Sequence, residues 1–72
     1  MIMEIGITAG EIWHFLEKKE NEQAKLKDII KGINRTEELI LMSLGWLARE
    51  GHVFICCDKN GYTASLVKHD NK

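Results

Sequence analysis

Apolar residues recur along the first part of the chain at the spacing of an α-helix. They stand three and four positions apart at Ala9, Ile12, Trp13 and Leu16. This spacing is typical of one face of a helix. Thr8 precedes the stripe and Glu11 follows Thr8 by three residues, which is the pattern of a capping box. We therefore expect the first helix to begin after Thr8 and to end in the polar run at residues 17–22.

Two further helices are predicted in the middle of the chain. The first of them is short, and its apolar residues again stand three and four apart at Leu26, Ile29, Ile30 and Ile33. Gly32 is expected to follow it in the left-handed conformation, within a tight turn at about residues 32–35. The next helix is predicted from about Thr36 to Glu50, with Thr36 or Asn34 as its N-cap and Gly51 at its end.

Residues 52–57 and 62–67 have the composition of β-strands. The four residues between them contain Asn60-Gly61, a strong signal for a hairpin turn. A short strand at residues 23–25 could pair with this hairpin. The order of elements predicts an α+β fold, the winged helix-turn-helix, in which three helices are followed by a β-hairpin wing. We expect this domain at residues 5–67 and a polar C-terminal tail at residues 68–72.

The third helix is apolar around most of its circumference when its residues are placed at about 100° intervals. The stripe predicted to face the core consists of Ile40, Leu44 and Leu47. A second apolar strip, about 100° away, consists of Leu39, Met42 and Trp46. The polar arc consists of Glu38, Gly45 and Arg49. Either another part of the chain covers the second strip, or its residues are a candidate interface with another protein or a second copy.

Charge bears on the choice between DNA and protein as a partner. The net charge is −1 and the pI is about 6.3, whereas a nucleic-acid-binding domain more often has a pI above about 9. Residues 18–35 nevertheless hold six basic and three acidic side chains, and the second helix and the turn within this range form the region that crosses the phosphate backbone in helix-turn-helix complexes. The candidate nucleic-acid-binding residues, here and at the wing tip, are Lys25, Lys27, Lys31, Arg35, Thr36, Lys59 and Asn60.

The sequence shows no pattern of a catalytic or metal site. Cys56 and Cys57 are adjacent, so their side chains are expected on opposite faces of a strand and unbonded to each other. They form no C-x-x-C pair, and no nucleophile, base and orienting group are recognisable together. We expect a protein without catalytic residues, metal, cofactor or small-molecule substrate. Since neither a signal peptide nor a membrane-spanning run is visible, we expect it in the cytoplasm, away from membranes.

A family resemblance enters at the end of the third predicted helix. Residues Leu44 to Gly51 read LGWLAREG and are followed by Val53, which resembles the end of the recognition helix in many winged-helix regulators. Together with Ala9 to Trp13, which read AGEIW, this string resembles a family of small stand-alone prokaryotic winged helix-turn-helix domains of unassigned function. The resemblance covers about residues 5–67. It implies the fold and a presumed DNA-binding role.

Two functions remain open at this point. The first is a DNA-binding module of the transcription-regulator kind, which would bind double-stranded DNA as a dimer. The alternative is a protein-interaction or homodimerisation module that uses the same scaffold without DNA. A 72-residue chain has a small core, which association often supplements, and an apolar, acidic third helix suits the alternative. The exposure of Met42 and Trp46 should help to separate them.

Overall fold

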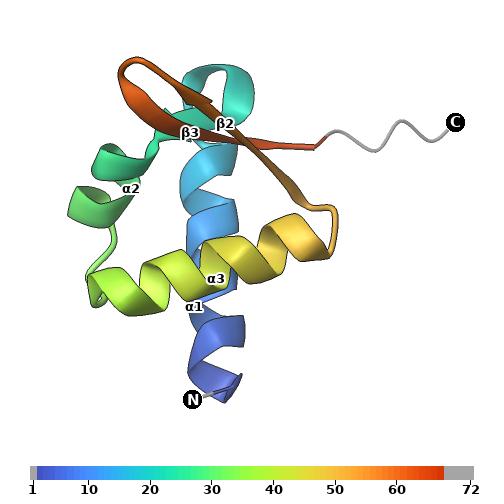
Figure 1. Cartoon of the computed structure of the whole chain (residues 1–72). Coiled ribbons are helices and arrows are strands. Elements are labelled where there is room, and N and C mark those ends of the chain that lie inside the picture. Colours follow the sequence, from blue (N-terminus) through green and yellow to red (C-terminus); the bar gives the residue numbers. More distant parts are fainter. Residues whose placement is uncertain (1, 68–72) are drawn as a thin grey trace, which may run out of the picture.

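The computed structural model describes residues 2–67 and has the predicted α+β architecture, a winged helix-turn-helix (Figure 1). A long helix is followed by a 3₁₀ turn, a short strand, two helices that form the helix-turn-helix, and a β-hairpin. The elements are α1 (Ile2–Glu17), η1 (Glu20–Glu22), β1 (Gln23–Lys25), α2 (Leu26–Gly32), α3 (Glu37–Arg49), β2 (Val53–Asp58) and β3 (Gly61–Leu66). The expected polar tail at residues 68–72 lies outside the described residues.

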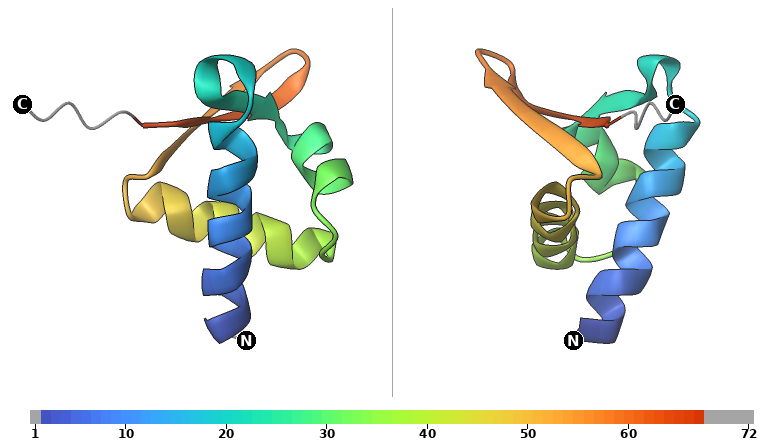
Figure 2. Two further views of the ribbon diagram at one scale, coloured as in Figure 1. Left: turned by 180° about the vertical axis from the view of Figure 1, so that it is seen from behind. Right: turned by 90° about the vertical axis from the view of Figure 1, so that its right-hand side faces the viewer.

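The helices and the sheet enclose one core between them. Helix α1 lies on one side of the molecule, while α3 and the hairpin lie on the other (Figure 2). The sheet has the strand order β1-β3-β2 with antiparallel pairing throughout. Strand β1 adds to the free edge of the hairpin through the pair Ala24 and Ala64, which confirms the short strand predicted from the sequence.

The predicted start of the first helix was wrong. Helix α1 begins at Ile2, so Thr8 lies inside it rather than at its N-cap. The Thr8 side chain is fully buried, and its Oγ1 has no hydrogen-bond partner among the described residues. Glu11 does not close a capping box, because its carboxylate binds Arg35. The half-buried Ile5 continues the apolar face of Ala9 upstream, and packing along that face overrides the local capping signal.

Of the three predictions for the ends of α2 and α3, one was wrong and two are confirmed. Gly32 is the last residue of α2 and does not have the predicted positive φ. It is glycine for another reason: a Cβ at this position would overlap the ring of Phe15. Thr36 caps α3 as predicted, since its Oγ1 accepts a hydrogen bond from Leu39 N at 3.2 Å. Gly51 follows α3 with a φ of 80°.

The hairpin turn is built from local hydrogen bonding and one glycine. Asp58 Oδ1 accepts a hydrogen bond from Asn60 N at 2.8 Å, and Gly61 provides the positive φ of 112° that the returning strand needs. The strand register places the alternate residues of the hairpin on one face, which we call the inner face: Val53, Ile55, Cys57, Tyr62, Ala64 and Leu66. Phe54 and Cys56 occupy the outer face, so the adjacent cysteines are separated and both are free.

The core confirms the stripe predicted on the third helix. Its buried apolar side chains come from all three helices and the hairpin: Ala9, Ile12, Leu16, Ile29, Ile33, Ile40, Leu44, Leu47, Val53 and Ala64. Within α3 the buried residues are Ile40, Leu44 and Leu47, together with Ser43. The Ser43 hydroxyl donates to Leu39 O at 2.7 Å, which satisfies it within the helix. One side of α3 is therefore committed to the core.

Replacing Leu47 with alanine should show how strongly this stripe stabilises the fold. Leu47 is 3% exposed, so Leu47→Ala should lower the free energy of unfolding by about 2–5 kcal/mol through lost burial and a cavity. Leu41→Ala, on the exposed side of the same helix, is the matched control and should cost less than about 1 kcal/mol at a protein concentration that keeps the chain monomeric. Urea denaturation measures both. Equal losses in the two variants would contradict the assigned faces of α3.

Candidate binding surfaces

Helix α3 turns a mixed apolar and acidic face away from the core. Its exposed residues are Glu37, Glu38, Leu41, Met42, Gly45, Trp46 and Arg49. Leu41, Met42 and Trp46 are each between 42% and 46% exposed, whereas Leu39, the third member of the predicted second strip, is half-buried. The structure thus leaves Met42 and Trp46 uncovered within residues 2–67. Their role in an interface stays a prediction.

An apolar groove runs between α3 and the inner face of the hairpin. It has a volume of about 220 Å³, and its exposed walls are formed by Leu41 and Gly45 on α3 and by Ile55 and Tyr62 on the hairpin. Leu26, Leu44 and Ala64 complete the lining. Gly45 contributes no side chain to this lining, and apart from its chain neighbours and the backbone of its own helix no atom lies within 4 Å of the position that its Cβ would take. The sequence pattern did not indicate this groove, since it needs two elements that are joined only by the fold.

A second hollow lies between α1 and the C-terminal half of α3. It has a volume of about 430 Å³ and is bordered by both tryptophans, Trp13 and Trp46. Gly6 and Gly10, one turn apart on α1, border it as well. Trp46 borders this hollow, whereas its neighbour Gly45 borders the apolar groove. Met42 and Trp46 are thus exposed apolar residues one turn apart on α3.

The candidate nucleic-acid-binding residues differ in their exposure. Lys27 and Lys31 are exposed and lie one turn apart on α2, so they share a face. Lys25 is half-buried in β1, where it pairs with Thr63. Lys59 and Asn60 form the tip of the wing, and the backbone N–H of Asn60 is held by Asp58. Of this set, Lys27, Lys31 and Lys59 are the exposed lysines.

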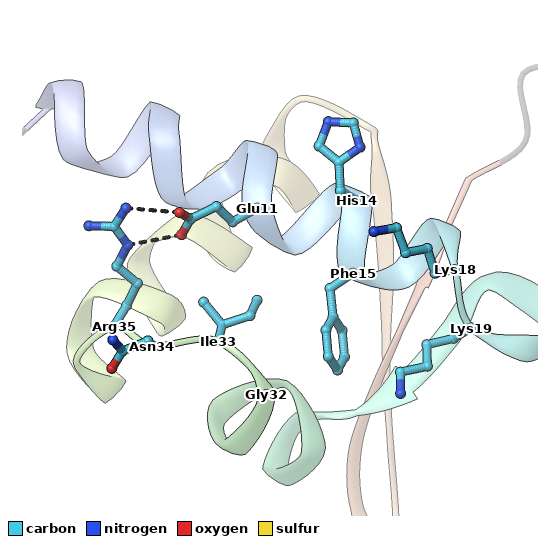
Figure 3. Close-up of a pocket in the computed structure, with 9 residues that line it drawn as sticks. All are labelled: Glu11, His14, Phe15, Lys18, Lys19, Gly32, Ile33, Asn34 and Arg35. Atoms are coloured by element: carbon cyan, nitrogen blue, oxygen red, sulfur yellow. Dashed lines mark hydrogen bonds and ion pairs between the residues drawn. The ribbon is translucent and has the colours of Figure 1, made fainter.

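Two further members of the predicted set are engaged in holding the fold. Arg35 donates two hydrogen bonds of 2.9 Å, from Nε and Nη2, to the two carboxylate oxygens of Glu11 (Figure 3). Thr36 accepts the capping hydrogen bond of α3. The side chains of both residues are therefore turned to structural partners, and their role toward DNA stays a prediction. The sequence could not indicate the Glu11–Arg35 pair, because its members are 24 residues apart.

The Glu11–Arg35 pair lies at one end of a hollow that has a volume of about 880 Å³ (Figure 3). Lys18, Lys19 and His14 also border this hollow. Lys19 Nζ lies 4.7 Å from the centre of the Phe15 ring, a cation–π contact. Several of its charged groups thus already have partners within the chain, which makes this hollow a weaker candidate for ligand binding than its volume suggests.

Metal and membrane sites are not supported by the part of the chain that the structure describes. Within residues 2–67, no group of three or more His, Cys, Asp or Glu side chains is arranged to hold a metal ion. None of the helices described has the length and hydrophobicity that crossing a bilayer requires.

Comparison with known proteins places the chain among small winged-helix domains. The model of the family described as "Winged helix-turn-helix domain (DUF2582)" matches residues 1–66. An uncharacterized protein of Methanocaldococcus jannaschii, MJ1608, is 33% identical over 63 residues, which are 88% of this chain and 90% of that protein. The solution NMR structure of protein BT2368 from Bacteroides thetaiotaomicron has a TM-score of 0.75 at 22% identity, over 97% of this chain and 94% of that one. This last similarity concerns the fold alone.

The Glu11–Arg35 pair should make stability depend on acid pH. The hydrogen bonds from Arg35 hold the pKa of Glu11 below its ordinary value. The pKa of a glutamate in the unfolded chain is about 4.3. A carboxylate whose pKa is lowered in the folded state stabilises the fold at pH values above the unfolded pKa, and this stabilisation is lost as the pH falls through the folded pKa. Denaturation at about pH 7 and about pH 3 should therefore show a smaller loss of stability for Glu11→Gln than for the wild type.

Glu20→Gln is the control for this measurement. Glu20 is an exposed carboxylate in η1 and takes part in neither ion pair found among residues 2–67. Its removal should leave the difference between the two pH values close to that of the wild type. If Glu11→Gln behaves in the same way as Glu20→Gln, the Glu11–Arg35 pair does not contribute to stability in solution.

Proposed function

Because this chain belongs to the winged helix-turn-helix domain family DUF2582, we propose a function for that scaffold: it is a non-catalytic protein-association module. Its binding surface is the exposed side of α3 together with the inner face of the hairpin, which we call the α3–wing surface. The observation that carries this proposal is the chemistry of α3. The helix that would enter a DNA groove presents leucine, methionine, tryptophan and glutamate there.

The exposed side chains of α3 are poorly suited to reading DNA. Base edges are read mainly by Arg, Lys, Asn, Gln, Ser and Thr, and Arg49 is the one exposed residue of these types on α3. Glu37 and Glu38 occupy the first turn of the helix, where carboxylates would be repelled by phosphates. A net charge of −1 adds little attraction to a polyanion.

The same surface has the properties of a protein interface. Leu41, Met42 and Trp46 on α3 are exposed beside Ile55 and Tyr62 on the hairpin. Contiguous exposed apolar patches on small soluble domains commonly mark association sites. Tryptophan, tyrosine and methionine are enriched in such interfaces, and the groove between α3 and the hairpin could accept an apolar side chain from a partner.

A photoreactive residue at position 62 tests what this surface binds. Tyr62 is 52% exposed on the α3–wing surface, so its replacement by p-benzoylphenylalanine should be tolerated and should crosslink whatever lies against the surface. Irradiation of cells that encode the chain, followed by mass spectrometry of the purified adducts, should give a protein adduct.

Phe54 provides the matched control for the crosslinking experiment. It is an exposed aromatic residue on the same hairpin, but it belongs to the outer face. The photoreactive residue at position 54 should give little or none of the adduct found at position 62. A DNA adduct at position 62, or equal protein adducts at both positions, would contradict the proposed function.

DNA binding through the phosphate backbone is the second candidate function. It is supported by the fold and by the exposed pair Lys27 and Lys31 on α2, the helix that crosses the backbone in helix-turn-helix complexes. Lys59 at the wing tip could add a further phosphate contact. This arrangement would give a transcription-regulator-like protein that binds duplexes with little dependence on their sequence.

Lys31→Ala tests the second candidate. If α2 contacts phosphate, the variant should bind duplexes of every sequence more weakly and should lower the slope of log affinity against log salt by about one unit. Lys18→Ala removes the same charge from the end of α1 and should leave the slope unchanged. Fluorescence anisotropy with labelled duplexes at several salt concentrations measures both slopes. Absence of binding at low salt, or affinity independent of salt, would remove this candidate.

A further inference from the structure

We propose that the partner of the α3–wing surface is a second copy of this chain, and that the two α3 helices pack against each other antiparallel about a twofold axis. The proposal rests on the proposed function and names its partner. It follows from the order of the exposed residues along α3, from the charges at the two ends of that face, and from the glycine near its middle.

The exposed face of α3 carries a seam with the spacing of helix-pairing sequences. Glu38, Met42, Gly45 and Arg49 stand four, three and four residues apart. All four are exposed, and a spacing that alternates between three and four keeps residues on one line along a helix that faces another helix. The core stripe on the opposite side follows a separate line. Helix α3 therefore has one seam for its own core and a second seam turned outward.

Charge selects the antiparallel orientation. A twofold axis that crosses α3 between residues 43 and 44 places Glu38 opposite the partner's Arg49, and symmetry repeats this pair at the other end. A parallel pair would instead set like charges against each other, Glu38 against Glu38 and Arg49 against Arg49. Neither side chain takes part in an ion pair within residues 2–67, so both are available to a second copy.

The sizes of the side chains along the seam favour the same register as the charges. The axis that pairs Glu38 with the partner's Arg49 also sets Met42 opposite the partner's Gly45. A long flexible side chain then meets a position without a side chain, and apart from the chain neighbours of Gly45 and the backbone of its own helix no atom lies within 4 Å of where its Cβ would be. Leu41 and Trp46 lie on the two sides of the seam, where each adds exposed apolar surface to the contact. One axis thus matches charge and size along the helix.

The hairpin enlarges the contact beyond the two helices. A helix of 13 residues is only about 20 Å long, whereas stable interfaces bury about 1,200–2,000 Å² in total. The wing projects on the same side of the molecule as α3 (Figure 2), and its exposed Ile55 and Tyr62 flank the seam. Dimer formation would cover the side of α3 that reads DNA in other helix-turn-helix proteins, so it excludes insertion of α3 into a groove.

Reversing the charge of Glu38 in one variant and of Arg49 in another tests the dimer directly, with sedimentation equilibrium as the measurement. Glu38→Arg alone sets arginine against arginine at both ends of the pair, and Arg49→Glu alone sets glutamate against glutamate. Each variant should dimerise at least about tenfold more weakly than the wild type. An equimolar mixture of the two variants restores both opposite-charge pairs, and so does the double variant E38R/R49E in a homodimer. Both should return to about the wild-type affinity.

Two further variants distinguish a loss of dimer contacts from a change in overall charge or in the stability of the monomer. Glu20→Arg reverses a charge on η1, outside α3, and should leave dimerisation unchanged. Gly45→Gln should raise the thermal stability of the monomer, because glycine is unfavourable inside a helix, yet it should weaken the dimer by filling the place of the partner's Met42. Because the mixture restores binding from two chains that are each defective, misfolding of a variant cannot produce the expected result.

The possible results distinguish this inference from the function on which it rests. A wild type that stays monomeric at millimolar concentration overturns the inference, as does a mixture that binds no better than its components. A double variant that dimerises as weakly as the single variants overturns the antiparallel register. If the chain is monomeric while the photoreactive residue at position 62 captures another protein, the dimer fails and the association function stands. If that residue captures DNA, the association function fails as well.

Discussion

The burial of one side of α3 against α1 and the hairpin is the constraint on which the rest of the structure depends. Ile12 and Leu16 of α1 and the α3 residues Ile40, Leu44 and Leu47 belong to one buried cluster. Once these side chains are removed from water, the rotation of α3 about its own axis is fixed. The residues between the core positions must then face outward, including Met42, Gly45 and Trp46. The outward chemistry of the helix is thus a consequence of its inward packing.

A chain of this size cannot bury all of its apolar residues. Of residues 3–67, ten hydrophobic side chains form the core and ten large ones remain exposed. Several of the exposed ones are not scattered singly over the surface, because Leu41, Ile55 and Tyr62 line one groove. Such clustering distinguishes a site of association from the single exposed apolar residues that every protein carries.

The polar contacts reinforce this distribution. The Glu11–Arg35 pair joins α1 to the turn between α2 and α3 and directs the Arg35 guanidinium toward α1. Among the candidate nucleic-acid-binding residues, the exposed lysines are Lys27 and Lys31 on α2 and Lys59 at the wing tip. At the same time Glu38 and Arg49 stay near opposite ends of α3, where their charges define a direction along the helix. This distribution of exposed charges supports the proposal of an oriented protein partner.

The sequence by itself determined the order of the elements, the α+β class and the core stripe of α3. These follow from local properties: apolar periodicity, the Thr36 cap and the turn chemistry at Asp58 to Gly61. What the sequence left undecided depended on residues that meet only in the folded chain. The start of α1 at Ile2 was decided by packing rather than by the cap signal at Thr8.

The same reason explains why the binding surfaces could be predicted only in part. Periodicity identified the second apolar strip on α3, but whether another element covered Met42 and Trp46 was decided by the placement of α1 and the hairpin. The apolar groove exists because α3 lies beside the inner face of the hairpin. The fold also brings Arg35, a candidate nucleic-acid-binding residue, within hydrogen-bonding distance of Glu11. The sequence determines which residues share a face of a helix. Whether a face is exposed, and which charges pair, depends on segments that are far apart in the sequence and meet only in the fold, so the tertiary structure decides both.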